Sequence, residues 1–108
     1  MPISKYFKLV VGVPATHADQ IRQALGVAGA GQQGNYSFCS SSHPSIGRFK
    51  PLPGAQPTIG EVDKMEEVVE ETVETICHED LIPAVIQAVK AVHPYEEPVI
   101  DTIPRFEV

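Results

Sequence analysis

The chain has 108 residues, 43% of them hydrophobic, and a formal net charge of −6 at pH 7, which suits one globular domain over residues 1–108. The negative charge argues against nucleic acid as a partner, because phosphate recognition needs clustered basic side chains. No apolar run approaches the roughly 20 residues that cross a bilayer and residues 1–5 show no signal-peptide pattern, so we predict a cytoplasmic protein without a membrane partner.

The first predicted element is a strand over residues 6–13. Leu9 and Val11 belong to an alternating apolar pattern in this segment, and Pro14 closes it. Because Val10 is apolar as well, we expect a central strand that is covered on much of both faces.

A helix is predicted next, over residues 16–28, and it ends at a glycine run. Residues 29–34 match GxGxxG letter for letter. The dinucleotide-binding fingerprint needs a strand before this pattern and a helix after it. Here a helix precedes the glycines, and residues 35–40 read as a strand. We therefore predict a tight turn that the glycines permit, and no dinucleotide site.

Residues 40–60 are rich in serine, glycine and proline, and we predict only one short strand there, at residues 46–50. An irregular excursion of this length is unusual in a small domain. Such segments are often functional or lie at subunit contacts.

Acidic side chains concentrate in residues 61–80, which hold nine of the fourteen in the chain. Within this block, residues 64–78 have apolar residues at helical spacing. Valine, threonine and isoleucine nevertheless dominate the other positions, and glutamates four residues apart would repel each other on a helix. We predict a long strand, bulged near Glu70, and read most of the acidic charge as a solvated face.

A second helix is predicted over residues 80–92, and a last strand over residues 99–106 that is interrupted by Pro104. The fold class is therefore α+β: a ferredoxin-like βαββαβ antiparallel sheet with a hairpin or loop insertion and two helices on one face. The other face has no cover within the chain, so we expect a homo-oligomer.

The stretch from His93 to Pro98, HPYEEP, joins the second helix to the last strand. Pro94 requires the helix to stop near Val92. His93 then lies at the negative end of the helix dipole, which favours the protonated imidazole. A rigid corner is the simplest interpretation. The functional alternative is a ligand-binding site, for which we name His93, Tyr95 and Glu97.

A divalent metal is a further possibility, with His93, Glu96 and Glu97 as ligands. Additional donors would come from four other side chains: Cys39, His43, Cys77 and His78. No pair among them has the spacing of a known ligand motif, and adjacent residues on a strand point to opposite faces.

The two cysteines, Cys39 and Cys77, lack C-x-x-C spacing. We expect reduced thiols that pack as small hydrophobic groups. An enzyme with Cys39 as nucleophile and His43 as base is conceivable, but no third orienting group is identifiable. We assign no catalytic residue and favour a non-catalytic role.

Four motifs together resemble the YqfO family: GxGxxGNYSFCS, GRFKPLPGAQPTIGEV, the acidic VEETVET and HPYEEP. Members are standalone relatives of the domain inserted in the NGG-one-interacting factor three-like proteins, and they resemble the CutA and PII groups more distantly. The resemblance implies a homotrimer with sheets facing a shared centre, and a strand at residues 64–78.

The resemblance also implies a function: a small-ligand-binding or regulatory module, with an unidentified ligand. The larger relatives carry a two-metal site, and some are called type 2 GTP cyclohydrolases. We expect their metal ligands to belong to the host domain, so no metal or catalytic residue is transferred to this chain.

Overall fold

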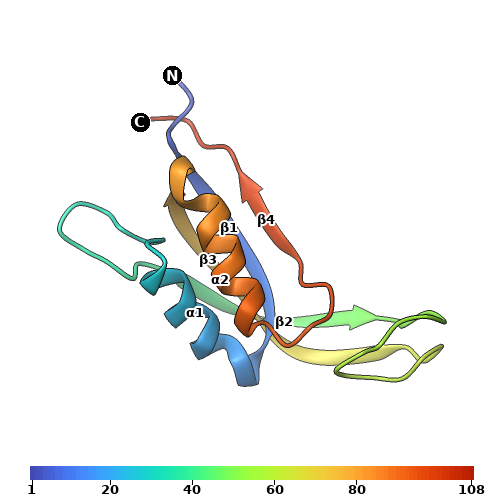
Figure 1. The fold of residues 1–108 in the computed structure, drawn as a ribbon. Helices are drawn as coiled ribbons and strands as arrows, with labels where there is room; N and C mark the ends of the chain where they lie inside the picture. The colour runs from blue at the N-terminus through green and yellow to red at the C-terminus, as the bar shows by residue number, and fades with distance from the viewer.

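The computed structural model describes all 108 residues. They form one four-stranded antiparallel sheet with two helices on one face, joined by loops (Figure 1). The sheet order is β2-β3-β1-β4, which confirms the predicted α+β, ferredoxin-like βαββαβ topology. A single 3₁₀ turn precedes each helix, η1 and η2. The elements in chain order are β1 (Tyr6–Pro14), η1 (Ala15–His17), α1 (Ala18–Val27), β2 (Ser41–Phe49), β3 (Glu66–His78), η2 (Glu79–Leu81), α2 (Ile82–Val92) and β4 (Ile100–Ile103).

The core lies between the helices and the central strands β1 and β3. Alternate residues of these strands face the helices and are fully buried, as the period of two in a strand requires. Desolvation of Cys77 within this layer raises the pKa of its thiol, and both cysteines are free. The largest core side chains are Leu9, Val11, Val13, Ile21, Leu25, Val73, Val85 and Val89.

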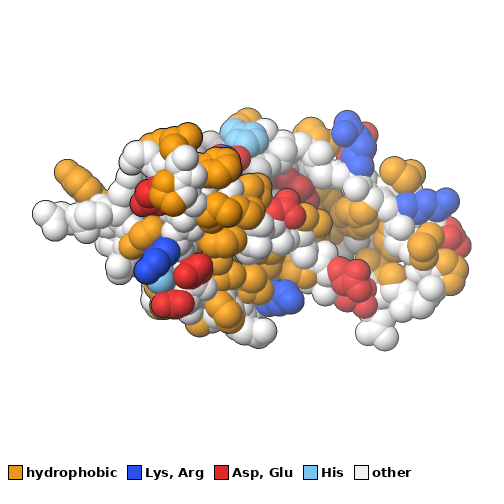
Figure 2. Space-filling view, turned by 90° about the horizontal axis from the view of Figure 1, so that it is seen from above, with side chains coloured by type: hydrophobic (Ala, Val, Ile, Leu, Met, Phe, Trp, Pro, Cys, Tyr) orange, Lys and Arg blue, Asp and Glu red, His pale blue; other side chains and the backbone are white.

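The opposite face of the sheet carries both apolar and polar side chains. Val10 and Ile76 lie there beside an ion pair between Lys8 and Glu74, whose Nζ and Oε2 atoms are 3.2 Å apart. The face that has no cover within the chain is therefore mixed in polarity. Seen from above, the molecule likewise shows hydrophobic groups between scattered acidic and basic side chains (Figure 2). Neither helix has the length and apolarity needed to cross a membrane.

The second strand begins later than predicted. The strand expected at residues 35–40 is wrong, because β2 starts only at Ser41. Gly31 and Gly34 have positive φ angles of 78° and 58°, and Phe38 also adopts a left-handed φ of 59°. These angles turn the chain back on itself. The ring of Phe38 packs over Gly26 of α1, where an added Cβ would meet it at 1.9 Å.

The third strand was predicted correctly, but the bulge predicted near Glu70 is wrong. Glu70 pairs with Pro14 of β1 and Ser45 of β2, and both ladders keep one register along their length. The last strand is shorter than expected and ends at Ile103, before Pro104, on the edge of the sheet.

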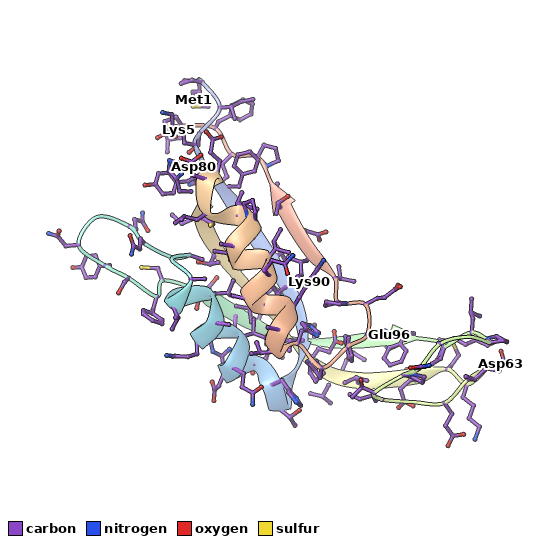
Figure 3. The ribbon with its side chains drawn as sticks, viewed as in Figure 1. Met1, Lys5, Asp63, Asp80, Lys90 and Glu96 are labelled. Atoms are coloured by element: carbon purple, nitrogen blue, oxygen red, sulfur yellow. The ribbon has the colours of Figure 1, made fainter.

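Strands β2 and β3 form a long hairpin that extends beyond the helices (Figure 1). Residues 50–65 close it, so the excursion predicted from composition includes most of β2 together with this loop. Figure 3 shows Asp63 at the far tip of the hairpin and Glu96 on the α2–β4 connection, away from the end that holds Lys5 and Asp80. The hairpin loop and the α2–β4 connection thus both lie at the end of the sheet that the helices do not cover.

Candidate functional site

The HPYEEP stretch forms the connection between α2 and β4. Helix α2 ends at Val92, as predicted, and His93 leaves the helix with φ −73° and ψ 133°. Strand β4 pairs with β1 only as far as Val11. The edge of β1 beyond that point is therefore free for the connection to pass alongside.

His93 braces this connection against β1. Its side chain is only 8% exposed, Nε2 donates a hydrogen bond to the Gly12 carbonyl at 2.7 Å, and Nδ1 accepts one from the Tyr95 backbone N–H at 3.1 Å. A carbonyl only accepts and an amide N–H only donates, so the ring is the neutral Nε2–H tautomer. The helix dipole alone would favour a protonated imidazole, but a protonated Nδ1 could not accept the hydrogen bond from the Tyr95 N–H.

Tyr95 reaches from the connection to the open face of the sheet. Its hydroxyl donates to Glu70 Oε2 at 2.5 Å, and its ring packs edge-on against Phe49 with centroids 5.7 Å apart. Desolvation first, and then the hydrogen bond to Glu70, raise the pKa of Tyr95. The phenol is therefore a fixed hydrogen-bond donor at neutral pH.

The Glu70 carboxylate lies over two glycines of the neighbouring strands. A Cβ added at Gly47 of β2 would come within 2.4 Å of Glu70 Cδ, and one added at Gly12 of β1 would lie 3.6 Å from Oε1. The close approach at Gly47 leaves no room for a side chain. Glycine on β2 thus makes the space in which a carboxylate meets the phenol.

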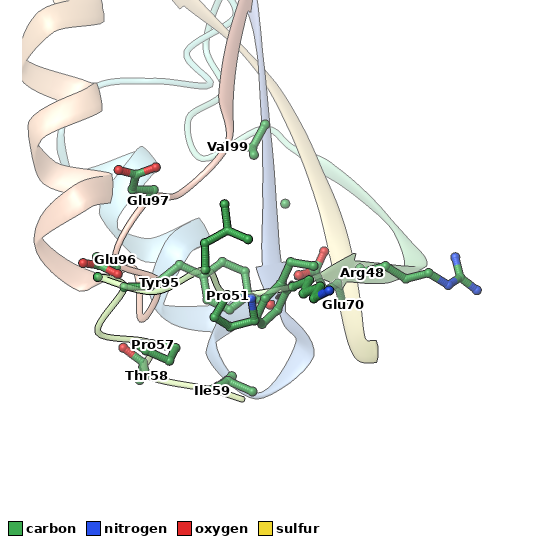
Figure 4. Close-up of a pocket in the computed structure, with 17 residues that line it drawn as sticks. Arg48, Pro51, Pro57, Thr58, Ile59, Glu70, Tyr95, Glu96, Glu97 and Val99 are labelled. Atoms are coloured by element: carbon green, nitrogen blue, oxygen red, sulfur yellow. Dashed lines mark hydrogen bonds between the residues drawn. The ribbon is translucent and has the colours of Figure 1, made fainter. Parts of the chain in front are cut away.

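The hairpin loop closes over this group from the other side. The backbone N–H of Gln56 donates to Glu96 Oε2 at 3.1 Å, which links the loop to the HPYEEP stretch. Between them lies a pocket of about 560 Å³ (Figure 4), a volume in the range of small-molecule sites. Its wall combines apolar loop residues with the carboxylates of Glu70, Glu96 and Glu97.

The structure therefore brings together most of the residues named from the sequence, in different roles. Tyr95, Glu96 and Glu97 line the pocket, whereas His93 supports its wall. In Figure 4 the carboxylate of Glu97 lies apart from that of Glu96.

No three histidine, cysteine or acidic side chains gather closely enough to hold a metal ion. A metal on His93, Glu96 and Glu97 stays a prediction, and it would require His93 to give up a hydrogen bond. No hydrogen bond joins Cys39 to His43, the proposed nucleophile and base; instead the Cys39 carbonyl accepts from Thr75.

Sequence reasoning missed the floor of the pocket. Gly12 and Gly47 interrupt strand patterns, which is a recognised signal of close approach by another group. Glu70 could not be distinguished within a run of glutamates. The link from Gln56 to Glu96 depends on backbone geometry and has no sequence signal.

The sequence matches curated proteins called GTP cyclohydrolase 1 type 2 homolog. It is 49% identical over 98 residues to that of Halalkalibacterium halodurans, and 50% identical over 97 residues to that of Bacillus subtilis. These alignments cover 91% and 90% of this chain but 26% of each relative, so the chain spans about a quarter of their length. No protein-family model matches the sequence.

Solved structures give the same picture. A Bacillus cereus protein related to NIF3 superposes with a TM-score of 0.83 at 40% identity, over 99% of this chain and 27% of that protein. The periplasmic divalent cation tolerance protein CutA from Archaeoglobus fulgidus superposes with a TM-score of 0.69 at 21% identity, over 95% of this chain and 86% of CutA. The second likeness establishes the shared fold.

Proposed function

Because the chain belongs to the YqfO/NIF3 family, we propose that it is a small-ligand-binding module with its site in the pocket between the hairpin loop and HPYEEP. The observation that carries this proposal is that the HPYEEP stretch forms one wall of the pocket and is held there by three hydrogen bonds. His93 fixes the connection to β1, Tyr95 joins it to Glu70, and Glu96 holds the loop. Three separate elements thereby surround one partly apolar space.

The same contacts favour binding over catalysis. The ring nitrogens of His93 both take part in hydrogen bonds, and the raised pKa of Tyr95 keeps its phenol protonated. Neither His93 nor Tyr95 therefore offers the free acceptor that a general base needs near the proton that it removes. The relatives' name refers to GTP cyclohydrolase; for this chain, an enzymatic role is an alternative that would need residues beyond those named here.

We also propose that the chain forms a homo-oligomer, with a trimer as the expected state. Ile103 on the open side of the edge strand is 43% exposed, and Val10 and Ile76 lie on the same face. Packing this face against another copy would remove apolar surface from water. Light scattering tests the proposal: a mass of about 12 kDa, that of one chain of 11.7 kDa, would contradict it.

The binding site is testable by NMR on the full chain with a mixture of small aromatic and aliphatic fragments. We expect amide shifts to concentrate in the segments 50–59 and 95–99, which supply most of the pocket lining. Val99→Trp, which places an indole in the pocket, should abolish them. Val69→Trp is the matched control, because both valines are 66% exposed and Val69 lies outside the pocket.

Shifts that scatter over the surface, or that survive in Val99→Trp, would contradict the proposed site. Equal loss of binding in both variants would point to a general effect of the added indole, and would count against the pocket as well.

A further inference from the structure

The floor of the pocket holds a carboxylate oxygen without a partner in the chain. Glu70 Oε2 accepts the hydrogen bond from Tyr95, whereas no donor of the chain reaches Oε1. Oε1 is also not sealed off, since no buried side-chain oxygen lacks a partner. One oxygen is thus held in place while the other remains available to a donor inside the pocket.

The position of this carboxylate is fixed before any ligand arrives. Gly47 lies directly beneath it, Gly12 borders it, and the phenol of Tyr95 holds it from the side. A charged acceptor that is held in this way loses little conformational freedom when it binds a donor. Hydrogen bonds to charged groups are also stronger than those between neutral groups.

The charges around the pocket favour a cation. Three carboxylates line it, those of Glu70, Glu96 and Glu97, against two basic residues, Arg48 and Lys50. Arg48 donates to Glu67 at 3.1 Å, and its guanidinium extends away from the pocket in Figure 4. Among the lining residues, Lys50 is thus the one base without a carboxylate partner, against three carboxylates.

The apolar residues that line the pocket favour a cationic ligand that also has an apolar part. Leu52 and Val99 line the pocket and are 64% and 66% exposed, so a ligand would cover surface that now faces water. Phe49, Pro51 and Ile59 add further apolar lining. A bare divalent metal would leave this apolar surface uncovered.

We propose that the pocket takes an organic amine with an apolar body, whose ammonium group donates to Glu70 Oε1 while its body packs against Leu52 and Val99. This inference rests on the proposed function, because it names the ligand class of the same pocket. Glu70 is the specificity-determining residue. Tyr95 is a positioning residue that acts through Glu70.

The test compares three probes of similar size on the full chain by NMR titration at neutral pH. The probes are phenethylamine, which is cationic, 2-phenylethanol, which is neutral, and 3-phenylpropanoate, which is anionic. We expect phenethylamine to bind about tenfold or more tightly than 2-phenylethanol, the gain of one charge-assisted hydrogen bond. We expect 3-phenylpropanoate to bind most weakly of the three.

Glu70→Gln separates charge from shape, since the amide oxygen still accepts from Tyr95. This variant should lose the preference for phenethylamine and retain the binding of 2-phenylethanol. Glu74→Gln is the matched control, because Glu74 lies on the same strand and face but outside the pocket. It should keep the wild-type order of affinities.

The outcomes separate the inference from the proposed function. If 2-phenylethanol or 3-phenylpropanoate binds as tightly as phenethylamine, or if Glu70→Gln keeps the preference, the inference fails and the pocket remains a binding site. If none of the three probes shifts the pocket residues, both proposals are contradicted.

Discussion

The two ends of the sheet are held together in different ways. Under the helices, side chains such as Leu9 and Val73 are at most 1% exposed, and burial of apolar surface supplies the stability. At the hairpin end, Leu52 is 64% exposed, and single polar contacts such as that of Gln56 with Glu96 set the shape. The helical end can therefore keep the fold while the hairpin end keeps an accessible pocket.

The sharpest contrast comes from removing one leucine at each end. Leu9→Ala should lower the free energy of unfolding by about 2–5 kcal/mol, because it leaves a cavity in the core. Leu52→Ala should change it by less than about 0.5 kcal/mol, as at other exposed sites. Urea denaturation of both variants measures the difference, and equal losses would show that the two ends are not distinct.

His93 connects the two ends, and its removal should have the next largest effect. His93→Ala leaves the Gly12 carbonyl without its donor and should cost about 1–3 kcal/mol of unfolding free energy. His43→Ala, at an exposed position on β2, is the control and should be nearly neutral. If His93→Ala left the free energy of unfolding unchanged in the same experiment, the hydrogen bond of His93 to Gly12 would contribute nothing to stability.

Two glycines at the boundary should respond unequally to an added methyl group. Gly47→Ala places its Cβ at 2.4 Å from Glu70 Cδ and must displace the carboxylate, at a cost of about 1–2 kcal/mol. Gly12→Ala meets the carboxylate at an ordinary 3.6 Å and should be tolerated. Thermal unfolding measures the loss of stability, and the NMR resonances of the Tyr95 ring report the displacement of the Glu70 carboxylate. Equal effects in Gly47→Ala and Gly12→Ala would contradict the geometry.

The smallest expected effect is a pH dependence from Tyr95. Its pKa is raised above the usual tyrosine value of 10.0, so the folded state binds a proton more tightly than the unfolded state. The resulting stabilisation is fully present below pH 10 and is lost as the pH rises toward the higher folded-state pKa. Tyr95→Phe should flatten this alkaline decline in unfolding free energy, and an unchanged slope would assign it to other groups.

The sequence predicted β1, β3 and α2 more accurately than the connection between α1 and β2, and the reason is physical. Leu9 and Val11 alternate because one face of β1 is buried, and Pro94 stops α2 whatever surrounds it. Between α1 and β2, by contrast, Phe38 adopts a left-handed conformation and packs over Gly26, so its aromatic character did not signal a strand.

The candidate site was found in part, because one of its walls is a continuous stretch of sequence. HPYEEP stood out through its prolines and its place between a helix and a strand. Its partner Glu70 lies 25 residues away from Tyr95 in a run of similar residues, and only the strand register brings them together. The hydrogen bond of His93 to the Gly12 carbonyl likewise joins residues that are 81 positions apart in the sequence.

The central claim is that HPYEEP builds a ligand pocket and that His93 is its brace. Side-chain ¹⁵N NMR of His93 at neutral pH, recorded before and after one equivalent of Zn²⁺, tests this most directly. The account predicts the neutral Nε2–H tautomer in both spectra, with its hydrogen bond to Gly12 intact. A doubly protonated ring, or a nitrogen that loses its proton to the metal, would contradict it.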